Sequence, residues 1–406
     1  MMLGLYLSIP FCRSKCTFCN FASGVFPTRY MEQYVARLEA DMRAARRRAA
    51  EWDAMLPEGV DSVYFGGGTP SLLPGELVRR VMGAIRREFA VSVGAEVTFE
   101  AAPAHLADET LEAMVECGVN RVSFGVQSFV DAEAHATGRL HGRRDVFADV
   151  TRVRAAGIGD VSLDLLAGLP GQTRASWRES LDALRETGVG HASVYMLEVD
   201  DESKLGAEML AGGVRYGAGL VPGEDAIAGM YEDAVATLAG MGLRQYEISN
   251  FAGEGRQSRH NRKYWERKPY LGVGVDAHSM LRDERGRALR FGTTDELEPY
   301  LSARDLSLLG WERPEPLARE QELEEAWFLG LRMNEGVDLA SLREEFGVAA
   351  AAEFEPVIAE LVEEGLVTRD AGRVALTMWG RLLSNEVFER FIGLAVQAHA
   401  PSAQTY

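Results

Sequence analysis

The sequence predicts an α/β fold in two parts: a partial (β/α)6 barrel of the TIM-like kind, then a smaller and mostly helical domain. Three patterns in the 406 residues lead to this prediction. Strand-like and helix-like segments alternate through the first part, which favours a parallel sheet with right-handed crossovers. Polar and glycine-rich segments follow the strands. The last part has the order helix, helix, hairpin and helix, which is typical of a winged-helix arrangement.

The barrel elements are expected in regular order. Apolar runs predict the strands, and apolar residues at helical spacing predict the helices, with Asp108 and Thr173 as amino-terminal caps. Glycines are expected to end three helices, at Gly118, Gly157 and Gly188. The expected strands are 3–9, 60–65, 95–100, 120–125, 161–166 and 192–197, and the expected helices are 28–50, 75–89, 108–117, 144–156, 173–187 and 224–241.

The second domain is expected to start near residue 309. A helix at 320–331 precedes DLASLREEFGV, FEPVIAELVEEGLV, the hairpin-like VTRDAGRVALT and a final helix to about Phe391. Modules of this kind often serve for docking, and this one is acidic, so DNA binding is not the favoured interpretation. The predicted division is 1–245 for the barrel, 246–308 for a connecting segment, 309–395 for the second domain and 396–406 for a tail.

The loops that follow the six strands are expected to meet at one rim. In barrel-like α/β folds the carboxyl ends of the strands carry the chemistry. The loops after residues 9, 65, 99, 124, 166 and 197 would therefore surround one mouth. One of them contains Y-F-G-G-G-T-P-S at 64–71, whose glycines let a ligand approach the backbone closely, although a lone glycine run is weak evidence for binding.

Composition excludes several classes of function. The net charge is -18 and the pI is about 5.0, which argues against a general nucleic-acid binder. No apolar run approaches the length of a membrane span. The basic run between Arg43 and Arg48 is most simply a solvated helix face, so membrane association is at most peripheral. With few cysteines and no signal or anchor recognised, the chain is expected in the cytoplasm, where thiols stay reduced.

Three cysteines lie within eight residues, at Cys12, Cys16 and Cys19, and the chain has one other, Cys117. Thiolates this close favour a soft metal centre. A cubane iron–sulfur cluster held by three cysteines leaves one iron open to a small molecule, because such clusters ordinarily take four protein ligands. A disulfide is disfavoured without a secretory signal, and a zinc site would need a fourth ligand, although the nearest histidine, His105, is far downstream.

Polar residues lie at or near the ends of predicted strands and add to the candidate site. These are Glu100, Gln127 and Asp164, and a carboxylate within an apolar strand is costly unless it is paired or binds a ligand. For Asp164 a buried cap or ion pair is an equal alternative. Arg139 could offer a bidentate fork to a carboxylate, or be an ordinary surface arginine.

The order of the motifs then indicates a family. The chain contains Y-L-S-I-P-F-C-x3-C-x-F-C, G-G-G-T-P, S-F-G-V-Q-S-F, G-R-x-H, D-L-x-x-G-L-P-G-Q-T and Y-x-L-E, in this order. With these motifs it resembles the radical S-adenosylmethionine (SAM) enzymes, and more narrowly the branch that contains oxygen-independent coproporphyrinogen III oxidase and the heme chaperone HemW. The resemblance runs from Tyr6 to the carboxyl-terminal module.

The resemblance implies a radical SAM barrel with cofactors and site residues. Cys12, Cys16 and Cys19 would be the ligands of a [4Fe-4S] cluster, and SAM would bind the open iron through its amino and carboxylate groups. Gly67, Gly68 and Thr69 would hold the methionine portion by backbone contacts, and we infer that Glu100 and Arg139 face its ammonium and carboxylate. The positions that match the SAM site of the family are Tyr6, Phe18, Gly67, Gly68, Thr69, Glu100, Gln127, Arg139 and Asp164.

Within the branch, three features favour the HemW side. Phe21 stands where the oxidase has a further cysteine, and Tyr6 lies almost at the start, without the extension of the oxidase. The run R-H-N-R-K-Y-W at 259–265 resembles the H-N-x-x-Y-W signature of HemW proteins. His260 is therefore a candidate heme contact; the alternative is a polar loop histidine that bonds to backbone.

Some positions depart from the pattern of the branch. Ser8 stands where histidine is usual, Ala101 and Ala102 replace the usual residues around E-A-N-P, and Asp276 stands where a small residue is usual. The change at Ser8 removes a side chain expected near the cluster or cofactor. It puts efficient reductive cleavage of SAM in doubt, but not the binding of a cluster.

The first functional hypothesis is a HemW-like chaperone that binds heme and delivers it to heme-accepting proteins, with a homodimer among its expected forms. The second is a radical SAM enzyme that oxidatively decarboxylates a tetrapyrrole, in the manner of coproporphyrinogen III oxidase. The missing cysteine and extension count against the second hypothesis, so enzymatic activity stays an open question. The third is a zinc-stabilised α/β protein. None of the three involves nucleic acid.

Overall fold

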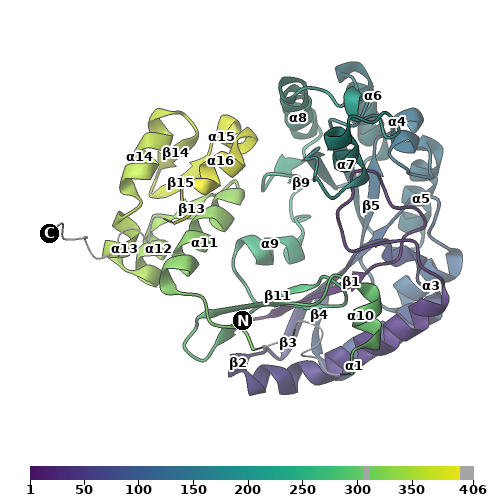
Figure 1. The fold of residues 1–406 in the computed structure, drawn as a ribbon, viewed down its shortest axis with the longest axis horizontal. Helices are drawn as coiled ribbons and strands as arrows, with labels where there is room; N and C mark the ends of the chain where they lie inside the picture. The colour runs from purple at the N-terminus through teal and green to yellow at the C-terminus, as the bar shows by residue number, and fades with distance from the viewer. Residues whose placement is uncertain (305–310, 312, 394–406) are drawn as a thin grey trace.

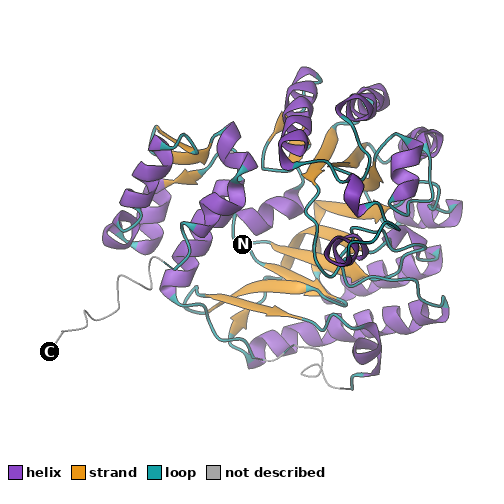
Figure 2. Cartoon of the chain, turned by 45° about the horizontal axis from the view of Figure 1, so that its top comes forward, coloured by secondary structure: helices purple, strands orange, loops and turns teal. Residues whose placement is uncertain are grey.

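The computed structural model describes residues 1–304, 311 and 313–393. A long curved sheet carries helices along its outer side, and a smaller helical domain packs beside it, at the left of Figure 1. Figure 2 shows the strands inside and the helices outside. The predicted α/β class, with a partial barrel and a mostly helical second domain, is confirmed.

Six parallel strands form the centre of the sheet in chain order, as the sequence predicts. They are β1 (Leu3–Ile9), β3 (Gly59–Gly67), β4 (Ala90–Ala101), β5 (Arg121–Gln127), β6 (Asp160–Ala167) and β7 (His191–Met196). The helices that follow them are α1 (Arg29–Glu51), α2 (Gly75–Glu88), α3 (Asp108–Glu116), α5 (Arg143–Ala155), α6 (Arg174–Thr187) and α8 (Glu224–Gly240). Six of the seven residues of β1 are buried, so its nearly continuous apolar run suits a strand covered on both faces.

The helix ends confirm most of the expected signals and correct one. Thr173 caps α6 by accepting a hydrogen bond from a first-turn backbone N–H, and Gly188 ends that helix at a φ of 60°. Asp108 is not a cap, because Ala107 occupies that position and Asp108 is the first helical residue. Its carboxylate instead pairs with Arg152 at 3.2 Å and lies in the first turn, where negative charge stabilises a helix.

Further strands extend both edges of the sheet, in segments where the sequence alone predicts none. The strand order is β12-β11-β10-β1-β3-β4-β5-β6-β7-β9-β8, in which β10 pairs with β1 in parallel and β9 pairs with β7 antiparallel. The added strands are β2 (Ala54–Met55), β8 (Arg244–Gln245), β9 (Asn250–Ala252), β10 (Tyr270–Val273), β11 (His278–Asp283) and β12 (Ala288–Gly292). The added helices are α4 (Asp131–Ala136), η1 (Pro70–Leu72), α7 (Lys204–Ala211), η2 (Ala218–Leu220), α9 (Arg259–Trp265) and α10 (Leu297–Ser302).

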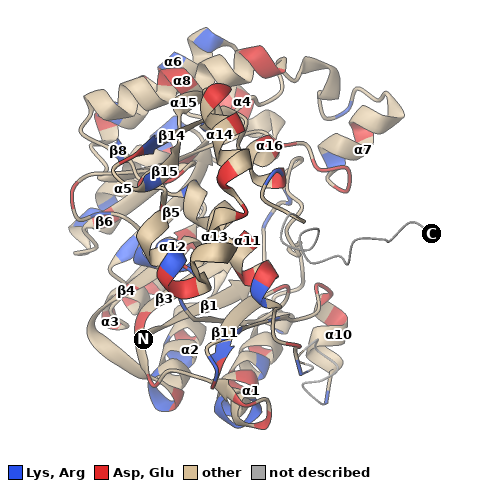
Figure 3. Ribbon diagram, turned by 90° about the vertical axis from the view of Figure 1, so that its left-hand side faces the viewer, with Lys and Arg blue, Asp and Glu red and all other residues tan. Residues whose placement is uncertain are grey.

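The carboxyl-terminal domain has its own core and the expected winged-helix order. Trp327 stacks on Phe391 with ring centroids 4.9 Å apart, and Phe354 packs against both. Acidic and basic residues are interspersed over this domain in Figure 3. Its elements are α11 (Arg319–Arg332), β13 (Val337–Asp338), α12 (Leu339–Phe346), α13 (Val348–Ala352), α14 (Glu355–Glu363), β14 (Val367–Asp370), β15 (Arg373–Leu376), α15 (Met378–Leu382) and α16 (Ser384–Glu389).

The two parts of the molecule meet at α9. The Arg332 guanidinium lies 4.3 Å from the centre of the Trp265 ring, a cation–π contact. The backbone N–H of Asn334 donates to the carbonyl of Tyr246 at 3.0 Å. The H-N-x-x-Y-W signature therefore lies at the junction of the sheet and the second domain. Among the described helices, none combines the length and the apolar character that crossing a membrane requires.

Candidate functional site

A cavity of about 350 Å³ opens at the carboxyl ends of the central strands, where the loops were expected to converge. We call it the first cavity. It brings together most of the predicted site residues, from three loops and four strands. Those that line it are Cys12, Cys16, Phe18, Cys19, Gly67, Gly68, Thr69, Glu100, Gln127, Arg139 and Asp164.

The cysteine loop is held at several points by the rest of the barrel. The Cys12 N–H donates to the Gly24 carbonyl at 2.8 Å, which closes the loop at its base. Thr17 donates from its N–H to the carbonyl of Thr137, and its own carbonyl accepts from Leu205 in α7. The loop is thus fixed before any ligand binds.

Two of the thiols of this loop are made harder to ionise by burial. All three are free, and burial raises the pKa of both Cys12 and Cys16 above the ordinary value of a thiol. A bound metal overrides such a shift, because a coordinating thiol loses its proton outright. Soft sulfur donors on one fixed loop fit an iron–sulfur cluster. Within the described residues, no three His, Cys, Asp or Glu side chains lie close enough to share one metal ion.

The glycine loop after β3 packs directly against the cysteine loop. A Cβ atom on Gly68 would lie 2.8 Å from the Ile9 carbonyl oxygen and 3.0 Å from Cys12 Sγ, so only glycine fits there. The N–H groups of Gly68 and Thr69 donate to the carbonyls of Ile9 and Phe11, both at 2.8 Å. A backbone contact from these two residues to a ligand would therefore use a carbonyl oxygen, which suits an ammonium group.

Two carboxyl groups and one guanidinium face the first cavity. Glu100 accepts a hydrogen bond from the Tyr64 hydroxyl at 2.7 Å, and Asp164 accepts from Ser123 Oγ at 3.1 Å. Burial raises the pKa of both carboxyls, that of Glu100 to about 7. Arg139 Nε is buried and makes no hydrogen bond to a described residue. An unpartnered guanidinium beside carboxyl groups fits a ligand that carries both an ammonium and a carboxylate.

Several lining residues were not predicted as site residues. Tyr195 lies at the end of β7 and Ser123 within β5, and both line the first cavity with Gly125. Each of these residues belongs to a predicted strand. Its position near the carboxyl end of that strand was the one sequence signal that could have marked it as a site residue. Gln127, which was predicted, has a φ of 68°, a left-handed backbone conformation that non-glycine residues adopt with strain.

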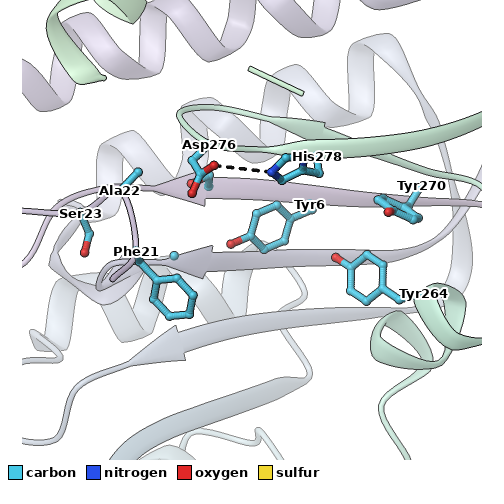
Figure 4. Close-up of a pocket in the computed structure, with 10 residues that line it drawn as sticks. Tyr6, Phe21, Ala22, Ser23, Tyr264, Tyr270, Asp276 and His278 are labelled. Carbon is cyan, nitrogen blue, oxygen red and sulfur yellow. Dashed lines mark ion pairs between the residues drawn. The ribbon is translucent and has the colours of Figure 1, made fainter. Parts of the chain in front are cut away.

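Tyr6 and His260 lie outside the first cavity. Tyr6 lines a neighbouring cavity of about 290 Å³, which we call the second cavity (Figure 4). The residues lining it are Tyr6, Ser8, Phe21, Ala22, Ser23, Gly67, Tyr264, Tyr270, Asp276 and His278. The two cavities share Phe21, Ser23 and Gly67 and are therefore adjacent.

His260 is buried in α9, and both of its ring nitrogens are engaged. Nδ1 lies 3.0 Å from Ser62 Oγ in β3, and Nε2 lies 2.9 Å from the Tyr264 hydroxyl. Burial lowers the pKa of His260 to about 3, so the ring is neutral. It is thus a helical residue bonded to side chains, not a loop residue bonded to backbone.

Comparisons with known proteins assign the family. Residues 6–184 match the model of the radical SAM superfamily, and residues 317–383 match the HemN C-terminal domain. The chain is 33% identical to the "Heme chaperone HemW" of Bacillus subtilis, over 97% of this chain and 100% of the relative. It is 32% identical to the protein of the same name from Mycobacterium tuberculosis H37Rv, over 96% of this chain and 95% of the relative.

Similarity extends to a mitochondrial protein and to a solved fold. The Bos taurus "Radical S-adenosyl methionine domain-containing protein 1, mitochondrial" is 34% identical over 82% of this chain and 74% of its own length. The crystal structure of Escherichia coli coproporphyrinogen III oxidase, HemN, superposes with a TM-score of 0.81 at 24% identity, covering 97% of this chain and 90% of that one, and shares the fold. Since the similarity to HemW proteins covers nearly the full length of both chains, this chain belongs to the radical SAM superfamily and, within it, to the HemW family.

Proposed function

We propose that this chain binds heme and delivers it to heme-accepting proteins, and that it carries a [4Fe-4S] cluster and SAM in the first cavity. The observation that carries the proposal is full-length similarity to relatives named heme chaperones. The adjacency of the two cavities supports it, because one is lined by thiols and charged groups and the other includes four aromatic rings of Tyr and Phe.

The residues of the first cavity would divide the binding between them. Cys12, Cys16 and Cys19 would hold the cluster, which supplies an iron with one open position when bound. Arg139 would bind the carboxylate of SAM, because its buried Nε makes no hydrogen bond to a described residue. Glu100 would accept a hydrogen bond from the ammonium group.

A tetrapyrrole-oxidising enzyme is the alternative. Phe21 stands where the oxidase has a further cysteine after the three cluster ligands. Its side chain is 59% exposed and lines both cavities. A phenylalanine cannot supply a thiol there. Incubation of reconstituted protein with coproporphyrinogen III, SAM and a reductant should therefore give no protoporphyrinogen, and efficient conversion would replace the chaperone proposal.

The direct test of the proposal is an anaerobic heme titration followed by transfer. Reconstituted protein should take up heme, keep it through gel filtration, and pass it to an apo-hemoprotein such as apomyoglobin, as judged by the acceptor's absorption spectrum. Titrations with and without SAM show whether the first cavity influences the second. A chain that neither retains nor transfers heme contradicts the proposal.

The remaining parts of the proposal concern setting and assembly. We place the chain in the cytoplasm, where its four thiols stay reduced. A homodimer is the expected assembly to test, by light scattering with and without heme. The expected partners of the chain are heme and heme-accepting proteins. Nucleic acid is not among them, because the chain carries a net charge of -18.

A further inference from the structure

Four of the ten residues that line the second cavity are tyrosines or phenylalanine. Tyr264 and Tyr270 lie at one end, in edge-to-face contact with ring centroids 4.6 Å apart, and Phe21 lies at the other end near Tyr6 (Figure 4). A flat, conjugated macrocycle is a good partner for such a surface, because aromatic rings bury large areas and prefer offset or edge contacts with one another. Part of the porphyrin would remain outside, since the cavity is only about 290 Å³.

One histidine lines the second cavity, and its imidazole is accessible. His278 begins β11, and its side chain is 75% exposed. Its Nε2 lies 3.6 Å from Asp276 Oδ1, too far for a hydrogen bond, and neither ring nitrogen bonds to another described residue. A neutral imidazole nitrogen with a free lone pair is a common ligand of heme iron.

We propose that His278 is the protein ligand of the heme iron and that the aromatic rings of the second cavity hold the porphyrin. This inference rests on the proposed heme binding and names its site. Asp276 would then accept a hydrogen bond from the imidazole N–H that does not bind iron, after a small rotation of the ring. Such a carboxylate partner fixes the orientation of a ligating histidine and raises the basicity of the nitrogen that binds the metal.

His260 is assigned a positioning role by the same contacts. To bind iron it would have to break its bonds to Ser62 and Tyr264 and leave a buried place, which leaves both hydroxyls unsatisfied. In its observed place it fixes the Tyr264 ring, which forms one end of the second cavity. The signature histidine would thus act through Tyr264.

Two departures from the branch pattern lie in this cavity, which supports the assignment. Ser8 and Asp276 both line it. Serine in place of a histidine removes an imidazole from the β1 side of this cavity. Asp276, in a left-handed conformation at a φ of 53°, places a carboxylate beside His278. These changes leave His278 as the accessible imidazole of the second cavity.

The test compares histidine variants of the full-length, anaerobically reconstituted protein by heme titration and absorption spectroscopy. H278A should bind heme at least about tenfold more weakly and shift the Soret band, because an iron ligand is lost. Added imidazole should restore the Soret position of H278G. The matched control is H135A, an exposed histidine on α4 that lines neither cavity, and it should match the wild type.

The His260 variants separate ligation from positioning. H260A should weaken heme binding but keep the wild-type Soret position, and imidazole should not rescue it. If H260A does not fold, S62A removes one of its two contacts and should give the same spectral result. The assignment is overturned if H278A keeps the wild-type spectrum and affinity, or if H260A alone shifts the Soret band. Wild-type protein that binds no heme would instead overturn the proposed function itself.

Discussion

The two cavities share a wall but differ in what they offer a ligand. The first has free thiols, two carboxyls and a guanidinium whose Nε makes no hydrogen bond to a described residue. The second has three tyrosines, an exposed phenylalanine and one accessible imidazole. The first cavity is built at the carboxyl ends of parallel strands, whereas the second also takes residues from α9 and from the starts of β10 and β11. Under the proposed function, the first cavity would hold a charged cofactor and the second a flat, mostly apolar cargo.

The largest expected effect is loss of the cluster from the first cavity. Cys16→Ser removes one of three sulfur ligands, so the anaerobically reconstituted variant should lose most of the about four irons and four sulfides that a [4Fe–4S] cluster contains. Iron and sulfide analysis measures this. Cys117→Ser is the control, because that thiol is buried in the core behind α3 and should leave the content unchanged. Equal iron in both variants would contradict the cluster site.

The next effect tests the guanidinium of the first cavity. Arg139→Gln should weaken SAM binding by about 10- to 100-fold, because a hydrogen bond between charged groups contributes about 1.5–3 kcal/mol. Equilibrium dialysis with the reconstituted protein measures the affinity. Arg143→Gln, which removes an exposed ion pair with Glu186 at 2.8 Å, is the matched control. Heme affinity should not change in either variant. If Arg139→Gln weakened heme binding together with SAM binding, the two cavities would not act separately.

The third effect concerns the wall of the second cavity. His260→Ala should lower the free energy of unfolding by about 2–3 kcal/mol, since the hydroxyls of Ser62 and Tyr264 lose their partner in a buried place. Urea denaturation of the apo-protein measures the change. His135→Ala, at an exposed position, should stay within about 0.5 kcal/mol of the wild type. If His260→Ala leaves the free energy of unfolding unchanged, His260 has no positioning role.

The smallest effect is a pH dependence from Glu100. Its pKa is raised to about 7 in the folded protein from 4.5, so the folded state binds the proton more tightly than the unfolded state. Stability from this group is full below about pH 4.5 and is lost as the pH rises through 7. The loss should be about 2 kcal/mol, since a cavity open to water screens part of the shift. The free energy of unfolding in urea should be measured for the wild type and for Glu100→Gln from pH 4.5 to 8. The difference between the two proteins should fall by this amount as the pH rises, and a difference that does not change with pH would contradict the prediction.

Much of the fold and of the first cavity could be predicted from sequence, because both follow local patterns. Apolar runs such as 3–9 and caps such as Thr173 are short-range signals, and the carboxyl ends of parallel strands must meet. The pairing of β10 with β1 joins residues far apart in the chain, and no local pattern reports it. The second cavity was missed for the same reason: its tyrosines come from β1, α9 and β10, its phenylalanine comes from the cysteine loop, and only the fold brings them together.

The histidines illustrate what motifs leave undetermined. His260 belongs to a recognisable signature, whereas His278 follows a departure from the pattern at Asp276. Burial and bonding, which the chain's letters do not record, place the first inside the protein and the second at a cavity. The H-N-x-x-Y-W signature thus identified the region of the second cavity. The three-dimensional contacts were needed to distinguish His278, the proposed iron ligand, from His260, which supports the cavity wall.

Anomalous diffraction at the iron absorption edge can locate every iron in crystals of anaerobically reconstituted and heme-loaded protein. We expect two separate iron positions: a cluster bound by Cys12, Cys16 and Cys19, and a single iron within bonding distance of His278. A heme iron bound at His260, or a cluster whose fourth iron is capped by a protein side chain, would contradict it.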